Sequence, residues 1–261
     1  MSKNYTPEIG TKHPPRETFE LRRELEQFLN QSFGNFVVDP PSGASNKAIS
    51  VGAVKWGVYA FFDYDGEPIY VGQTRESLGT RIRRHLTNQR TDAVAMSVLD
   101  PFEVKSIRVW PLPQFQDAKG KPTQNALARQ AADHLNSLEF TVFHKLVADS
   151  RFKRILNEKD PPHVAPCELG IEISGDIVSA GVLRDREHPD LRIARRSQTI
   201  SRLALIISGR SVKPGLRRAL LTQAQRLQYL AEARFTAMGG EAAIEVRAAD
   251  EPTELDFEDE S

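Results

Sequence analysis

Hydrophobic and polar positions alternate most clearly between residues 57 and 72, in the sequence GVYAFFDYDGEPIYVG. Residues 57–62 are rich in β-formers, Asp65-Gly66 is a strong hairpin turn signal, and the apolar pattern resumes at residue 68. The stretch therefore predicts a β-hairpin. Such a hairpin brings two phenols, Tyr59 and Tyr70, close together on paired strands.

The remaining patterns predict a third strand and several helices. Residues 102–110 alternate with a period of two, whereas apolar residues recur at helical spacing in 18–33 and 125–147. Residues 77–86 can form a short basic helix. The element order predicts an α/β fold, with a small three-stranded, mostly antiparallel sheet flanked by helices. Beyond it, residues 171–178 could form a separate hairpin, and 198–208 and 214–238 predict a helical C-terminal extension.

Breaker-rich stretches divide the chain into four expected parts. Residues 1–50 form an N-terminal arm and helix, and residues 51–160 form the α/β domain. Residues 161–240 form a basic, mainly helical region, followed by an acidic, disordered tail at 241–261.

The composition is that of a soluble globular protein, with 39% hydrophobic and 27% charged residues. No apolar stretch is long enough to cross a bilayer, and the first residues lack the apolar core of a signal peptide, so we expect a cytoplasmic protein without membrane contact. The single cysteine, Cys167, excludes an internal disulfide and a cysteine-based zinc cage.

The formal net charge of zero hides an uneven distribution of charge along the chain. Residues 192–234 contain ten basic residues and one acid, whereas residues 241–261 contain nine acids and one base. The basic segment could lie along nucleic-acid phosphates, with the tail competing for it, or it could be a solvated helix face beside a disordered tail. A protein partner for the basic helices is a third alternative.

Downstream of the hairpin, four polar residues follow in the order Arg, His, Glu and Asn. Arg81 and His85 are four positions apart, so they lie on one face of the helix predicted there. Glu139 falls within the long helix at 125–147, and Asn157 follows that helix.

The tripeptides Gly57-Val58-Tyr59 and Tyr70-Val71-Gly72, together with these four residues in this order, resemble the GIY-YIG nuclease superfamily. Valine replaces the family's isoleucine in both tripeptides. The interval from Glu139 to Asn157 is long for the family, and Arg83 is an alternative to Arg81. The resemblance covers about residues 54–160 and implies a catalytic set of Tyr59, Tyr70, Arg81, His85, Glu139 and Asn157.

These residue types suit phosphodiester hydrolysis. A lone carboxylate, Glu139, suits a hydrated Mg²⁺ or Mn²⁺, which keeps several waters as ligands. The planar Arg81 guanidinium matches phosphate oxygens. A phenol is a poor base in water, but a nearby cation favours its phenolate, so Tyr59 could accept a proton from the attacking water. Tyr70 would orient the water or phosphate, His85 would relay protons, and Asn157 would hold the site together.

We therefore expect a metal-dependent endonuclease acting on double-stranded DNA, in restriction or defence. The alternatives are a repair or recombination nuclease and a non-catalytic DNA-binding protein that retains the fold. A homodimer is left open. The arginines expected to contact DNA are Arg83, Arg84, Arg90, Arg195, Arg196, Arg217 and Arg218.

Overall fold

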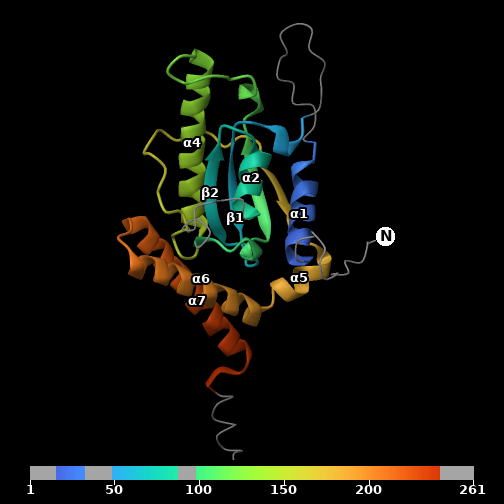
Figure 1. The fold of residues 1–261 in the computed structure, drawn as a ribbon, viewed down its shortest axis with the longest axis vertical. Coiled ribbons are helices and arrows are strands. Elements are labelled where there is room, and N and C mark those ends of the chain that lie inside the picture. Colours follow the sequence, from blue (N-terminus) through green and yellow to red (C-terminus); the bar gives the residue numbers. More distant parts are fainter. Residues whose placement is uncertain (1–15, 33–48, 88–97, 242–261) are drawn as a thin grey trace, which may run out of the picture.

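The computed structural model describes residues 16–32, 49–87 and 98–241 (Figure 1). The α-helices, in chain order, are α1 Arg16–Leu29, α2 Leu78–Leu86, α4 Ala126–Asp149, α5 Ala180–Arg186, α6 Pro189–Gly209 and α7 Pro214–Ala237. The strands are β1 Gly57–Phe62, β2 Pro68–Thr74, β3 Ser106–Pro111 and β4 Ile173–Asp176. Three short 3₁₀ helices occupy Val51–Ala53, Pro101–Glu103 and Pro113–Phe115. Within these ranges, no helix combines the length and apolar composition needed to cross a bilayer.

The strands form one antiparallel sheet in the order β2-β1-β3-β4. This confirms the α/β class and the antiparallel sheet, but the expected number of three strands is wrong. The fourth strand, β4, pairs with β3 instead of forming a hairpin within residues 171–178. Strand β4 has only four residues, and its partner lies more than 60 positions earlier in the chain. Local alternation could not reveal such a pairing.

The predicted β1–β2 hairpin is confirmed, and its turn is stabilised by local hydrogen bonds. The Asp63 carboxylate accepts hydrogen bonds from the backbone N–H groups of Asp65 and Glu67, at 2.9 and 3.0 Å. Gly66 adopts a φ of +73°, in the left-handed region that favours glycine. The register places Tyr59 opposite Gly72, so the two tripeptides meet across the hairpin.

Helices cover both faces of the sheet (Figure 1). Helix α4 covers one face, where alternate residues of β1 such as Val58 and Ala60 join a core with Leu135. The other face packs against α1 and α2, and there Tyr59 and Phe61 are buried. Because β1 is central and covered on both faces, it is apolar along its whole length. The predicted long helix is confirmed as α4, whose first turn is capped by Asn125.

Helices α6 and α7 pack against the turn of the hairpin through buried charges. The Asp63 side chain is only 1% exposed and accepts hydrogen bonds from Arg196 and Arg226. Arg192 lies 3.7 Å from the same carboxylate and forms a bidentate pair with Asp65. The C-terminal helices are thus fastened to the sheet that carries both tyrosines.

Candidate active site

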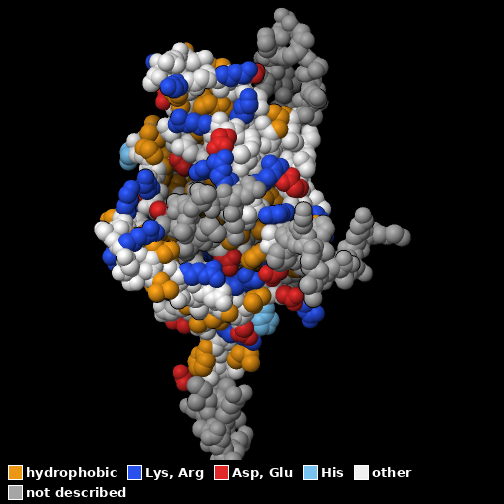
Figure 2. Space-filling model, in the orientation of Figure 1, with side chains coloured by type: hydrophobic (Ala, Val, Ile, Leu, Met, Phe, Trp, Pro, Cys, Tyr) orange, Lys and Arg blue, Asp and Glu red, His pale blue; other side chains and the backbone are white. Residues whose placement is uncertain are grey.

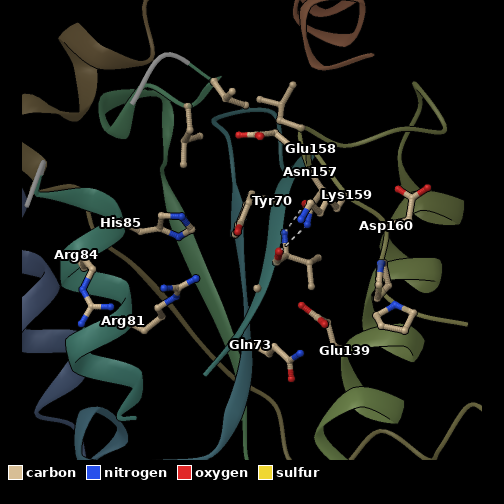
Figure 3. Close-up of a pocket in the computed structure, with 17 residues that line it drawn as sticks. Tyr70, Gln73, Arg81, Arg84, His85, Glu139, Asn157, Glu158, Lys159 and Asp160 are labelled. Carbon is tan, nitrogen blue, oxygen red and sulfur yellow. Dashed lines mark hydrogen bonds between the residues drawn. The ribbon is translucent and has the colours of Figure 1, made fainter. Parts of the chain in front are cut away.

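A cleft of about 440 Å³ opens at the edge of the sheet, around strand β2 (Figure 3). The residues that line it come from β2, α2, α4 and the segment after α4. They are Tyr70, Val71, Gly72, Gln73, Arg81, Arg84, His85, Val98, Leu99, Glu139, Leu156, Asn157, Glu158, Lys159, Asp160, Pro161 and Pro162. Five of the six expected catalytic residues are in this set, and the sixth, Tyr59, lies behind it.

The functional side chains approach the cleft from both faces of β2. Arg81 and His85 project from α2 on one side of the strand, and Glu139 projects from α4 on the other (Figure 3). Strand β2 is the outer strand of the sheet, and Gly72 presents no side chain between the two groups. A substrate group lying across Gly72 could therefore meet a guanidinium and a carboxylate together.

Tyr59, Tyr70 and His85 form a compact aromatic cluster. The Tyr59 hydroxyl shares a hydrogen bond with His85 Nδ1 at 3.0 Å. The rings of Tyr70 and His85 meet edge to face, with centroids 4.7 Å apart. Tyr70 and His85 line the cleft, whereas Tyr59 is fully buried and is linked to the cleft by its hydrogen bond with His85.

Gly72 is required by the position of the Tyr59 phenol. A Cβ atom at residue 72 would lie 2.6 Å from both Cζ and Oη of Tyr59 and 2.9 Å from Cε1 of Tyr70. Any side chain here would displace the phenol from His85. This contact gives a physical reason for the glycine that ends the second tripeptide.

The structure distinguishes the two candidate arginines of α2. Arg83 points away from the cleft and forms a bidentate ion pair with Glu26 of α1. Arg81 points into the cleft, and its Nε is buried without a hydrogen-bond partner among the described residues. A buried unpaired donor favours an acceptor from outside the chain. Of the two arginines, Arg81 is therefore the one that faces the cleft.

Glu139 is a half-buried carboxyl group that makes no hydrogen bond or ion pair with the described residues. Burial raises the pKa of Glu139 to about 7, although Arg75 and Arg81 act in the opposite direction by favouring the charged form. The described ranges contain no cluster of three or more His, Cys, Asp or Glu side chains able to hold a metal ion. The donor set thus fits a cation that takes one carboxylate and keeps its waters.

Asn157 clamps the outer strand of the sheet. Its side-chain oxygen accepts a hydrogen bond from the Val71 N–H at 3.0 Å, and its Nδ2 donates to the Val71 carbonyl at 2.8 Å. The neighbouring Leu156 N–H donates to the Ile69 carbonyl. These bonds satisfy the free edge of β2 and fix the backbone between Tyr70 and Gly72.

The arginines expected to contact DNA fall into different environments. Arg84 lines the cleft and is paired with Glu76. Arg195 pairs with Glu17, and Arg90 lies outside the described residues.

Helices α6 and α7 carry the other three of these arginines. Arg196 is 3% exposed and is bound by Asp63 and Glu103, so it is not available to a phosphate in this structure. Arg218 pairs with Asp160, whereas Arg217 is exposed on the surface of α7.

Two residues of β2 and its continuation belong to the site although the sequence analysis did not single them out. Gln73 lines the cleft and donates a hydrogen bond to Asn136 of α4 at 3.3 Å. Arg75 is close enough to Glu139 to lower its pKa. Strand periodicity offered a signal, because Val71, Gln73 and Arg75 alternate with Tyr70 and Gly72.

Residues 55–114 match the family model of the GIY-YIG catalytic domain. The match contains Tyr59, Tyr70, Arg81 and His85, whereas Glu139 and Asn157 lie beyond it. No curated protein and no solved structure matches the chain. The matched domain indicates a function of the nuclease type. This match assigns residues 55–114 to the GIY-YIG nuclease superfamily.

Proposed function

We propose that this protein is a divalent-metal-dependent endonuclease that hydrolyses phosphodiester bonds in double-stranded DNA. The observation that carries the proposal is that Arg81 and Glu139 lie on opposite sides of strand β2, in a cleft that also holds Tyr70 and His85. A phosphate at this position would meet a permanent positive charge on one side and a carboxylate on the other.

Glu139 is the residue we propose as the metal ligand. Ionising a desolvated carboxyl group is unfavourable, and a bound divalent cation would offset that penalty. Mg²⁺ or Mn²⁺ would supply charge neutralisation at the phosphate and at the departing 3′ oxygen when bound. Arg75 and Gln73 flank the carboxylate and would orient water around it.

Arg81 would bind a non-bridging phosphate oxygen. Its guanidinium is always charged, and its buried Nε lacks an internal acceptor among the described residues, so a phosphate would satisfy it. Because negative charge grows on these oxygens in the transition state, the interaction strengthens as the reaction proceeds. Arg83 cannot replace it without breaking the pair with Glu26.

Tyr70 and His85 would contact the attacking water, with Tyr59 behind them. When His85 takes a proton from the water at Nε2, its Nδ1–H donates to the Tyr59 oxygen, so the buried phenol would hold this tautomer and stabilise the imidazolium. Tyr70 holds the imidazole by an edge-to-face contact and would orient the water. Asn157 would act indirectly, by fixing the backbone of β2 beneath the phosphate.

Incubation with supercoiled plasmid tests the proposal. We expect wild-type protein to nick or linearise the plasmid with Mg²⁺ or Mn²⁺ and to be inactive in EDTA, and Glu139→Gln to be inactive with either metal. DNA affinity without cleavage by the wild type would instead indicate a non-catalytic binding protein. A homodimer presenting two clefts would produce linear plasmid early, and sedimentation at the assay concentration would check that stoichiometry.

We place this activity in restriction or defence. The support is compositional, because the single Cys167 excludes cysteine-based zinc fingers as a targeting device. Sequencing the ends produced from a randomised plasmid library tests this role. A short fixed target sequence would support it, and cleavage at branched or damaged sites irrespective of sequence would support repair or recombination.

A further inference from the structure

A second hollow, of about 620 Å³, adjoins the cleft where the end of α4 meets the start of α7. Asp160 lines both cavities, so the two lie next to each other at the segment that follows α4. Lys and Arg side chains lie along this edge of the molecule in Figure 2, beside the connection from α6 to α7. The residues that line this groove are Phe143, His144, Val147, Lys153, Arg154, Ile155, Asp160, Arg217, Arg218 and Leu221.

The groove carries positive charge that the described residues do not neutralise. Lys153, Arg154, Arg217 and Arg218 face one acid, Asp160, which is occupied by a bidentate pair with Arg218. Arg154 and Arg217 are exposed and have no ion pair within the described ranges.

Other arginines of the C-terminal helices are used internally. Arg192, Arg196 and Arg226 are bound by Asp63 or Asp65 and are almost fully buried. The basic excess of this region therefore divides into a buried set that fastens the helices and an exposed set that includes the groove.

The groove is held at a fixed position relative to the cleft. A Cβ atom on Gly215, in the first turn of α7, would lie 1.7 Å from the Glu158 carbonyl oxygen, so the helix backbone directly touches the cleft wall. Arg218 also donates to the carbonyl of Asn157 at 3.4 Å, beside the amide that clamps β2. Helix α7 thus positions Arg217 with respect to the proposed metal ligand and phosphate site.

We propose that this groove binds the phosphate backbone of the DNA strand that enters or leaves the cleft. The inference rests on the proposed function and deepens it, by assigning a substrate-binding surface formed partly by α7. Along α4, the groove residues Phe143 and Val147 lie four and eight positions beyond Glu139. At a rise of about 1.5 Å per residue this is about 6–12 Å, or about two to four nucleotides of a B-form strand. For a strand that runs along α4, the bound phosphates are those about two to four nucleotides from the scissile bond.

A pair of double variants tests the groove. The test variant is Arg154→Gln with Arg217→Gln, and the matched control is Arg184→Gln with Arg202→Gln. All four arginines are exposed and lack an ion pair in the described structure, so both variants remove two charges without breaking an internal contact. DNA affinity is measured in EDTA across a salt series, on a duplex too short for several proteins, and unfolding temperatures confirm that the variants are folded.

We expect the groove variant to bind more weakly than wild type and to have a salt slope smaller by about 1.8, because each phosphate contact contributes about 0.9. The ratio of wild-type to variant DNA affinity then falls by about 12-fold between 50 and 200 mM salt. In the control variant, the salt slope should decrease by less than half of the amount expected for the groove variant. Methylphosphonates placed two to four nucleotides from the cut should weaken wild type and leave the groove variant unaffected.

Equal slopes for wild type, groove variant and control would overturn the proposal and favour a protein partner for α7. Because binding is measured without metal, this result is separate from cleavage. A wild-type protein that binds through the groove but never cuts would refute the proposed function and leave the groove assignment standing. If both double variants instead cleave normally, with unchanged KM and salt slope, the groove assignment is refuted and the proposed function stands.

Discussion

Replacing Glu139 by glutamine should abolish cleavage and, in the absence of metal, remove a pH-dependent destabilisation of the fold. Glu139 has a folded-state pKa of about 7, well above the ordinary value of 4.5, because burial disfavours its charged form. Glutamine has nearly the same shape and never ionises. The substitution therefore separates the effect of the charge from that of packing.

The sign and size of the effect follow from proton linkage. Between pH 4.5 and 7 the folded protein holds the Glu139 proton and the unfolded chain does not, so the free energy of unfolding falls as the pH rises. Each pKa unit corresponds to about 1.4 kcal/mol, which gives about 3 kcal/mol in total as an upper value, since the side chain retains some contact with water. For a chain of this size, that corresponds to about 6–12 °C in unfolding temperature.

The measurement is thermal or urea unfolding of wild type and Glu139→Gln in EDTA, at pH 5 and at pH 8. Other titrating groups contribute equally to both proteins, so the difference between the two pH dependences isolates Glu139. We expect wild type to lose up to about 3 kcal/mol more than the variant on going from pH 5 to pH 8. Adding Mg²⁺ at pH 8 should restore stability to wild type, by about 2.7 kcal/mol at one hundred times the dissociation constant, and leave the variant unchanged.

Identical pH dependences for the two proteins would refute the reasoning, because Glu139 would then ionise as easily in the folded state as in water. A variant stabilised by Mg²⁺ as strongly as wild type would show that the cation binds elsewhere. Loss of cleavage alone would not distinguish a metal ligand from a residue that shapes the cleft, which is why the stability measurement accompanies the plasmid assay.

Three further substitutions test the geometry of the site and its support. Gly72→Ala should reduce cleavage by at least about 100-fold with DNA affinity retained, because its Cβ would displace the Tyr59 phenol, as single-turnover rates would reveal. Arg81→Lys should lose far more activity than Arg83→Lys, because the exposed ion pair of Arg83 with Glu26 contributes only about 0–1 kcal/mol. If kcat falls more in Arg83→Lys, Arg83 and not Arg81 is the arginine that acts in the cleft. Asp63→Asn should lower the free energy of unfolding by about 3–5 kcal/mol in urea titrations, because it leaves buried arginines unpaired, and a change below 1 kcal/mol would contradict that role.

The parts of the site that the sequence predicts are those set by local pattern. The hairpin follows from β-formers around Asp65-Gly66, and the long helix α4 follows from apolar spacing. The i,i+4 spacing of Arg81 and His85 does place both in the cleft. In each case the determining interactions lie within one turn or one hairpin, so neighbouring residues carry the information.

The parts that the sequence does not predict depend on contacts between distant segments. The choice between Arg81 and Arg83 depends on Glu26, which lies 57 positions before Arg83. Strand β4 depends on an edge of β3 left open by the rest of the sheet. The basic excess of residues 192–234 suggests a phosphate-binding surface, but Arg196 reaches Asp63 across 133 positions and is buried there. Charge counts alone cannot separate arginines that bind a ligand from arginines that hold the fold together.

The buried ion pairs around Asp63 imply that α6 and α7 belong to the same cooperative unit as the β1–β2 hairpin. Asp63 closes the turn of the hairpin through its backbone contacts and also binds Arg196 and Arg226. Removing one partner of these pairs leaves a buried charge uncompensated, so the hairpin turn and the two helices stabilise one another. Since β1 and β2 hold Tyr59 and Gly72, a disturbance of the C-terminal helices would reach the site through the strands themselves. The family match ends at residue 114, whereas the hairpin within it is bound by helices that begin more than 70 positions further along the chain.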